Sequence, residues 1–481
     1  MNMNANIKIK TFVLFLVAGL CGLVMQAAEY SDANFKYAYN KSQKFARVES
    51  TIKKTATSLT IPSKITINGV SYPVTQIGAY ACSDLQKLRS ITIPSSVTEI
   101  REGAFSNCFE LTSVKIPANV TKIENDVFSM CLKLKEVSLP KNLTEIGEGA
   151  FMYCGSIEII NWPSKLAKVG PYAFNGAKLP LYVELPASCV EIGEEAFRAT
   201  DVESFKLPAK VNNIGRMAFA DGQKLLGITM PTQVGTIGDF AFFGNVFVVD
   251  IVMPQTIGRM GEHVFQRCDK LNKVTWSPSL TTVPAYTFFE CYDLEWITLP
   301  DNITSIGESA FGECYSLKEF HFPASLKTIG PDAFDDDNLG EIVLNAGLTT
   351  IGAGAFNANS RITSVTIPAS VKEIGARAFD NNPHIEVVTC PSVTPPILAE
   401  DGFHMLTYAS ANLVVPAQSV MAYKRAAGWS NFQRINDSST GIDEMEIQDG
   451  DSTTLYDLQG RRSSGKGIHV DSGSRKLILR H

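Results

Sequence analysis

The sequence predicts a solenoid of stacked repeats, with a parallel β-sheet on one face, turns or short helical segments on the other, and a cap at each end. Three observations predict it: one motif recurs every 22 or 23 residues, each copy contains one strand-like segment, and no copy can bury its own apolar face alone. Of the 481 residues 45% are hydrophobic and 19% are charged, so the chain can fill a long interior.

The repeat has the form I-G-x-x-A-F-x-x-C-x-x-L-x-x-I-x-I-P-x-x-V-x-x, and clear copies begin at Val97, Leu143 and Ile303. We number positions within a repeat from 0 at the opening residue. The array spans residues 77–396, and two of its repeats, those opening at Ile192 and Ile329, have 22 residues. The fourteen opening residues are Ile77, Ile100, Ile123, Ile146, Val169, Ile192, Ile214, Ile237, Met260, Val283, Ile306, Ile329, Ile351 and Ile374.

Each fixed position of the repeat has a structural interpretation. The L-x-x-I-x-I segment alternates as a short strand with one buried face, and the following Pro ends it because it has no N–H to donate. Gly at position 1 permits a turn that a side chain would obstruct. Position 5 is Phe in every repeat but the first, which has Cys82, and these rings should stack as an internal spine.

Both ends of such a stack expose core and strand edges, so caps are expected. Residues 29–76 fit an N-terminal cap, with Asn68-Gly69 as a hairpin turn. Residues 397–435 fit a C-terminal cap, with a strand at 412–416 and a helix at 418–427.

The first 28 residues indicate export. Lys8 and Lys10 precede an apolar run from Thr11 to Met25, and Ala27-Ala28 provides small residues for cleavage, which is the pattern of a signal peptide. The run is shorter than the ~20 residues that span a bilayer, so a retained anchor is disfavoured and no transmembrane segment is expected after cleavage. We expect the mature protein at the cell surface or secreted, with the periplasm as an alternative. The net charge of −6 argues against nucleic acid as a partner.

The repeat signature resembles the BspA-like leucine-rich repeats of bacterial surface and secreted proteins, over Ile77 to about Pro396. The flanking segments SYPVTQIG and NLVVPAQSVMAYKRAAGWSNF are similar to that family as well. The resemblance implies a leucine-rich-repeat fold and an exported protein, and some members of the family attach to extracellular host proteins or other cells. It does not name a ligand.

Residues 436–481 are interpreted as a linker, over 436–450, and a small β-rich tail. The tail, TTLYDLQGRRSSGKGIHVDSGSRKLILRH, resembles C-terminal modules of exported bacterial proteins, the longest of which act as sorting signals. This copy is short, which leaves its sorting role, and attachment to the cell envelope, open.

Three motifs that in other proteins can form a disulfide, bind a metal or bind phosphate are interpreted here as structural. Six cysteines share position 8, but in-register side chains stand about 4.8 Å apart, too far for a disulfide, and a linear column does not suit zinc. GRRSSGKG at Gly460–Gly467 lacks the Ser or Thr of a phosphate-binding loop and is interpreted as a hairpin turn. Asp335-Asp336-Asp337 lacks the glutamate of an EF-hand and is interpreted as a solvated loop. We predict no catalytic residues, cofactor or metal, and no enzyme.

The outward side chains of the strands remain as candidates for ligand binding. Two groups differ from the Thr- and Ser-rich surface, and their exposed aromatic rings suit a protein or glycan ligand outside the cell. Three interpretations stay open: binding, cover of these groups by caps or loops, and a structural spacer without a ligand; an enzyme with a loop-borne site is the least favoured. The candidate residues are Ile159, Leu181 and Tyr182 in one group and Glu295, Trp296 and His321 in the other.

Overall fold

A computed structural model describes residues 28–155, 157–159, 162–340 and 342–437, and three strands of the tail. The predicted signal peptide, apart from Ala28, and most of the predicted linker lie outside the described residues. The chain forms two compact units. The first extends to Phe247 and includes Thr256–Arg259, and the second contains Val248–Gln255 and the chain from Met260 onward.

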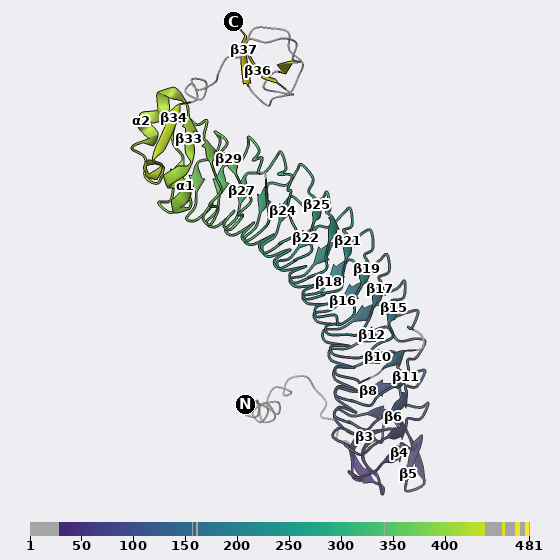
Figure 1. Cartoon of the computed structure of the whole chain (residues 1–481). Coiled ribbons are helices and arrows are strands. Elements are labelled where there is room, and N and C mark those ends of the chain that lie inside the picture. The colour runs from purple at the N-terminus through teal and green to yellow at the C-terminus, as the bar shows by residue number, and fades with distance from the viewer. Residues whose placement is uncertain are drawn as a thin grey trace. The chain divides into compact units, whose positions relative to one another are not determined.

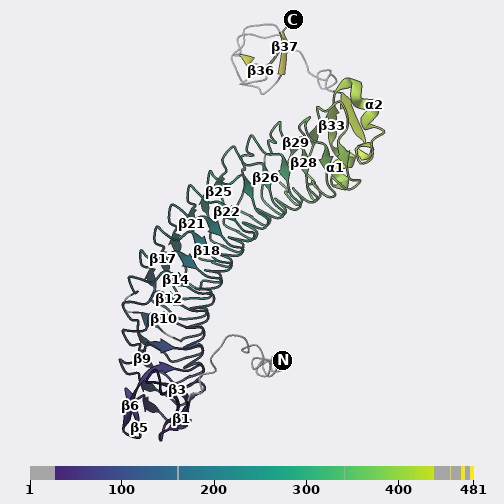
Figure 2. The same cartoon turned by 180° about the vertical axis from the view of Figure 1, so that it is seen from behind.

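Both units consist of coils that stack with parallel strands, which confirms the predicted solenoid (Figure 1). The strands predicted from L-x-x-I-x-I are present in most coils, and the same row of arrows is seen from behind in Figure 2. In the first unit they are β4 (Ser58–Thr60), β7 (Ser90–Thr92), β9 (Ser113–Lys115), β11 (Glu136–Ser138), β13 (Glu158–Ile159), β15 (Tyr182–Glu184), β17 (Ser204–Lys206) and β19 (Gly227–Thr229). In the second unit they are β21 (Asp250–Val252), β23 (Lys273–Thr275), β25 (Trp296–Thr298), β29 (Ser364–Thr366) and β31 (Val387–Thr389).

A second row of two-residue strands ends on the opening residue of each repeat after the first, so the prediction of one strand per repeat was wrong. Its members pair in parallel from coil to coil. In the first unit they are β8 (Glu99–Ile100), β10 (Lys122–Ile123), β12 (Glu145–Ile146), β14 (Lys168–Val169), β16 (Glu191–Ile192), β18 (Asn213–Ile214) and β20 (Thr236–Ile237). Further along are β22 (Arg259–Met260), β24 (Thr282–Val283), β26 (Ser305–Ile306), β27 (Thr328–Ile329), β28 (Thr350–Ile351), β30 (Glu373–Ile374) and β32 (Ile397–Leu398).

The glycine at position 1 is explained by close stacking of these strands. A Cβ added to Gly193 would lie 2.5 Å from the backbone nitrogen of Pro171 in the preceding coil, and one added to Gly352 would lie 2.4 Å from the carbonyl carbon of Gly330. Neither glycine has a positive φ. The glycine is therefore required for the approach of two backbones and not for the turn that the sequence suggested.

The side opposite the strands consists of turns, and no described residue of the array is helical. Backbone N–H groups at positions 3, 5 and 7 donate to the next coil; those of Gly103, Phe105 and Asn107 do so at 2.9 Å each. Positions 3 and 7 have positive φ in every repeat, although most are not glycine, for example Met217 and Phe240. This left-handed backbone tightens the turns at a conformational cost.

The interior contains the predicted spine of position 5 phenylalanines, each at most 1% exposed. Successive rings are stacked, as between Phe105 and Phe128 at 5.5 Å and 7° in the first unit and between Phe334 and Phe356 at 5.4 Å and 3° in the second. The nine described cysteines are buried and form no disulfide with one another. For the six at position 8, this burial fits the small apolar packing that the sequence predicts.

Strands cap the N-terminal end of the first unit. They are β1 (Ala28–Ser31), β2 (Phe35–Asn40), β3 (Phe45–Thr51), β5 (Lys64–Ile67) and β6 (Val70–Ile77). β5 and β6 form the antiparallel hairpin predicted at Asn68-Gly69, where both residues have positive φ. β6 also pairs in parallel with β8, which joins the cap to the first coils.

The C-terminal end of the second unit is closed by β33 (Asn412–Val415), β34 (Arg434–Asp437) and short helices. The predicted helix at 418–427 is shorter, with a 3-10 turn at Ala417–Ser419 followed by α2 (Val420–Tyr423), and α1 (Met405–Ser410) was not predicted. Trp429 and Phe432 are buried as expected, and the indole of Trp429 donates to the Pro396 carbonyl at 2.7 Å. Among the described residues, no helix has the length and apolar character needed to cross a bilayer.

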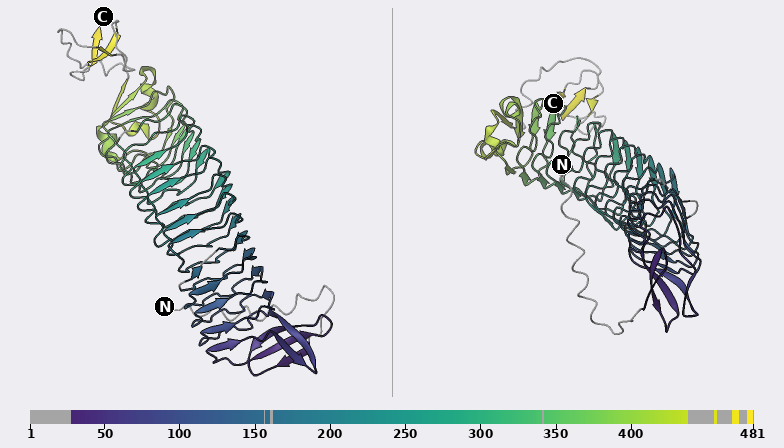
Figure 3. Two further views of the ribbon diagram at one scale, coloured as in Figure 1. Left: turned by 90° about the vertical axis from the view of Figure 1, so that its right-hand side faces the viewer. Right: turned by 90° about the horizontal axis from the view of Figure 1, so that it is seen from below.

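The described part of the tail is a small antiparallel sheet of β35 (Leu455–Tyr456), β36 (Gly467–Asp471) and β37 (Leu477–Arg480). The turn predicted over Gly460–Gly467 lies outside the described residues except for Gly467. Figure 3 shows the regular succession of strands from coil to coil in each unit.

Candidate binding surface on the strand face

The first group of candidates lies in the first unit, with Ile159 on β13, Leu181 directly before β15 and Tyr182 on β15. Leu181 is 50% exposed and Tyr182 is 53% exposed, whereas the side chain of Ile159 lies outside the described residues. The Tyr182 hydroxyl donates to Glu184 at 3.3 Å, and Lys206 of the next coil donates to the other oxygen of Glu184 at 2.8 Å. The polar groups beside this tyrosine therefore already have partners within the protein.

This pairing also acts on the two charged groups themselves. The Lys206 ammonium lowers the pKa of the Glu184 carboxyl, chiefly through their hydrogen bond, and Glu184 raises the pKa of Lys206 for the same reason. Both groups stay charged across the physiological pH range and remain hydrogen-bonded to each other.

The second group of candidates is centred on β25 of the second unit. Trp296 is 65% exposed, and its register partner on β23 is Lys273, which in turn is the partner of Asp250 on β21. Glu295, the residue before Trp296, is exposed. The side chains of Asp250, Lys273 and Glu295 make no ion pair or hydrogen bond with another described residue.

His321 is exposed, as expected, but its coil has no strand at this place. No hydrogen bond or ring contact joins it to Trp296 in the part of the chain that the structure describes. Glu295 directly precedes β25, which begins at Trp296, whereas His321 lies on a separate, irregular coil.

Trp296 differs from the other three tryptophans of the chain. Trp276 and Trp429 are buried at 4% and 0% exposure, and Trp162 is half-buried. Caps and loops of the described chain do not cover Trp296, which removes the covered-ring interpretation for this residue. Burying an indole against a partner would remove a large apolar area from water, so this exposed ring offers apolar area for contact with another molecule.

The exposed apolar residues outside the candidates include three on or directly before β19 and β21. Leu226 is 57% exposed in the first unit, and Val249 and Val252 are 48% and 69% exposed in the second. Leu226 and Val249 occupy the repeat position that also holds Leu181 and Glu295, so the signal that selected those two residues would have found them.

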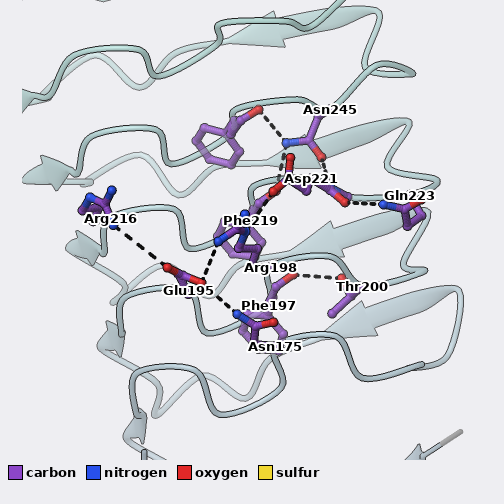
Figure 4. A network of polar contacts seen from close by, with 12 residues as sticks. Asn175, Glu195, Phe197, Arg198, Thr200, Arg216, Phe219, Asp221, Gln223 and Asn245 are labelled. Atoms are coloured by element: carbon purple, nitrogen blue, oxygen red, sulfur yellow. Dashed lines mark hydrogen bonds and ion pairs between the residues drawn. The ribbon is translucent and has the colours of Figure 1, made fainter. Parts of the chain in front are cut away.

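A buried glutamate and half-buried charges form a separate network on the turn side of the first unit (Figure 4). Glu195, which is 8% exposed, accepts hydrogen bonds from Asn175 at 2.8 Å and Arg198 at 3.0 Å. Arg198 also donates to Asp221 at 2.8 Å. Each charge has an opposite partner, so the network fixes neighbouring coils and offers no free acid, base or nucleophile.

The acidic run does not form the fully solvated loop that was predicted. Asp336 is exposed, but Asp337 is buried at 6% exposure, because position 8 points into the coil. Among the residues that the structure describes, no three acidic, histidine or cysteine side chains are grouped so as to hold a metal ion.

The model of the BspA type leucine rich repeat region matches residues 51–180, 181–295 and 281–400, most of the chain. The chain belongs to the BspA-type leucine-rich-repeat family. It is similar to the crystal structure of a leucine-rich repeat protein from Bacteroides ovatus, with 27% identity and a TM-score of 0.60 over 75% of this chain and 94% of that one. No match is found among curated proteins.

A second similar structure is a leucine rich cell surface protein from Faecalibacterium prausnitzii, with 20% identity and a TM-score of 0.41 over 83% of this chain and 98% of that one. The family match and the Bacteroides ovatus structure confirm the fold class and the family resemblance that the sequence predicts.

Proposed function

We propose that this BspA-type protein is exported and binds a protein or glycan ligand outside the cell through the strand face around Trp296. The observation that carries the proposal is an indole that is 65% exposed among unpaired charged side chains of both signs. The ring supplies apolar contact area, and Lys273, Asp250 and Glu295 supply a donor and acceptors without first breaking internal bonds.

The Tyr182 group supports a weaker contribution to ligand binding. Its tyrosine hydroxyl and the adjacent charges are hydrogen-bonded to one another, so a ligand would have to compete with them. We therefore assign it a secondary role at most, and we assign no catalytic function to either group.

The test is retention of the purified mature chain on arrays of glycans and of extracellular matrix proteins, comparing wild type with Trp296→Ala. Val343→Ala is a matched control, since Val343 is an exposed apolar residue (69%) elsewhere on the same unit. We expect Trp296→Ala to lose the ligands that wild type and Val343→Ala retain. Equal retention by all three proteins would contradict recognition through Trp296, and no retained ligand at all would favour the structural-spacer interpretation.

Cell fractionation with protease treatment of intact cells tests the export part of the proposal independently. We expect the processed chain to be digested from outside or found in the medium. Recovery of an uncleaved chain in the cytoplasm would contradict export whatever the arrays show.

A further inference from the structure

Position 8 of the repeat places a hydrogen-bond donor inside the coil. The cysteine thiols at this position donate to the position 5 carbonyl of the preceding coil, as Cys131 does to Phe105 at 3.3 Å and Cys314 to Phe288 at 3.2 Å. Where asparagine replaces cysteine the same bond forms, from Asn382 to Phe356 at 2.7 Å. Thiol and amide are thus interchangeable here because both can donate a hydrogen bond to that carbonyl.

Asn245 in the first unit shows how a planar side chain fits this position (Figure 4). Its oxygen accepts from the backbone N–H of Gly222, which is position 8 of the preceding coil, at 3.1 Å. Its amide nitrogen donates to two carbonyls, those of Phe219 at 2.9 Å and Phe242 at 2.6 Å. One end of the side chain is an acceptor and the other must be a donor.

Asp337 occupies position 8 in the second unit with the same arrangement. Its Oδ1 accepts from the backbone N–H of Cys314, position 8 of the preceding coil, at 2.8 Å. By this correspondence we infer that its Oδ2 takes the place of the amide nitrogen of Asn245, where the equivalent carbonyl belongs to Phe311. Oδ2 is buried and has no hydrogen-bond partner among the described residues when the side chain is a carboxylate.

We propose that Asp337 is a neutral carboxylic acid in the folded protein, and that its Oδ2–H donates to the Phe311 carbonyl in place of the usual amide or thiol. A carboxylate would instead bring a second acceptor to a carbonyl oxygen inside the coil, which costs far more than an unmade bond between neutral groups. The site is thereby a proton-dependent link between the Ile306 and Ile329 coils, and it goes beyond the proposed binding function.

Burial and the charges next to Asp337 also favour its protonated form. Burial raises its pKa well above the ordinary value, and the neighbouring carboxylates Asp335 and Asp336 raise the pKa further. The Cys314 backbone N–H lowers it, and no lysine or arginine among the described residues acts on it. On the side of the following coil stands the neutral amide of Asn359, whose oxygen accepts from the Leu339 N–H at 3.1 Å.

Asp337 should make the free energy of unfolding depend on pH. Because the folded pKa lies above the unfolded value of about 3.9, the folded state holds the proton more tightly. The contribution of Asp337 to stability is fully present below about pH 4 and is lost as pH rises toward the folded pKa. The free energy of unfolding should therefore fall as the pH rises from about 4, while the folded chain keeps the proton on Asp337 up to its own, higher pKa.

Infrared spectroscopy of the full chain tests the proposal directly, with Asp337→Asn as the variant and Asp336→Asn as the matched control on the exposed neighbour. We expect wild type at about pH 7 to show a protonated-carboxyl C=O band that Asp336→Asn retains and Asp337→Asn lacks. The band should vanish when the wild-type chain is unfolded by heat. Absence of any such band in folded wild type, or its persistence in Asp337→Asn, would overturn the proposal.

Thermal unfolding gives an independent readout. Asp337→Asn should melt above wild type at about pH 8, and the difference should shrink as the pH is lowered to about 4. Asp336→Asn should show no such convergence. A difference between Asp337→Asn and wild type that stays constant with pH would contradict a proton on Asp337, and the wild-type infrared spectrum decides alone if the variant does not fold.

Discussion

β15, β17 and β19 of the first unit and β21, β23 and β25 of the second are both three-stranded parallel ladders with one residue of each strand turned inward. In the first, Glu184 and Lys206 are register partners and form an ion pair at 2.8 Å. In the second, Asp250 and Lys273 are register partners too, yet they do not pair, and Trp296 stands next to them.

The difference shows where the repeat constrains the chain and where it does not. Inward positions of both ladders hold the same apolar residue types, because each coil must fill the same space. Outward positions contact only their neighbours on the sheet, so one ladder can satisfy its own polar groups and the other can leave them for a ligand. We therefore attribute stability to the shared interior and propose recognition for the second ladder.

The largest expected effects concern the interior, where the two units should behave alike. Phe219→Ala in the first unit and Phe311→Ala in the second each remove a fully buried ring and should cost about 3–5 kcal/mol in the free energy of unfolding. Denaturant unfolding measures this cost. Near-wild-type stability of either variant would mean that its coil does not depend on the stacked spine.

Substitution of the position 1 glycines should have a smaller effect in both units. Gly193→Ala and Gly352→Ala place a Cβ against the backbone of the preceding coil, which has no flexible end that can move away. We expect each to lose about 1–3 kcal/mol of stability in the same unfolding assay. An unchanged midpoint would show that the coils can separate without cost.

The charged neighbours of the two aromatic groups should respond differently in binding. Lys273→Met should weaken retention of a ligand about tenfold, since a hydrogen bond to a charged group contributes about 1.5 kcal/mol. Lys206→Met, the matched change beside Tyr182, should leave the affinity unchanged because Lys206 already bonds Glu184. Equal loss in both variants would place the ligand on both ladders.

The smallest expected effect concerns the left-handed turns. Ala358 has a φ of 57°, a conformation that only glycine adopts without steric cost. Ala358→Gly should therefore be neutral or raise stability by up to about 1 kcal/mol, in contrast to the usual loss on replacing alanine by glycine. A clear loss in thermal unfolding would show that this turn is held by the side chain.

The sequence predicted the solenoid, the Phe spine and the exposure of Tyr182 and Trp296, because a fixed period and a two-residue alternation are visible in single letters. It did not reveal the second row of strands, since segments such as Glu191–Ile192 are too short to alternate. Nor did it reveal the left-handed turns, which residues such as Met217 occupy without any glycine signal.

Side-chain pairing was the other feature that the repeat could not predict. Alternation turns Lys206 and Lys273 to the same face, but only the structure shows that one bonds a neighbour and the other does not. Likewise Asp337 looked like part of a solvated acidic run because its neighbours are polar, whereas the coil geometry directs position 8 inward.

Collisional quenching of tryptophan fluorescence tests the recognition claim most directly, because Trp296 is the one indole of the four that is mostly exposed. We expect acrylamide to quench a component of the wild-type emission that Trp296→Phe lacks, and a saturating ligand from the arrays to protect that component. A bound ligand that leaves it as open to quenching as in the free protein would contradict recognition through Trp296.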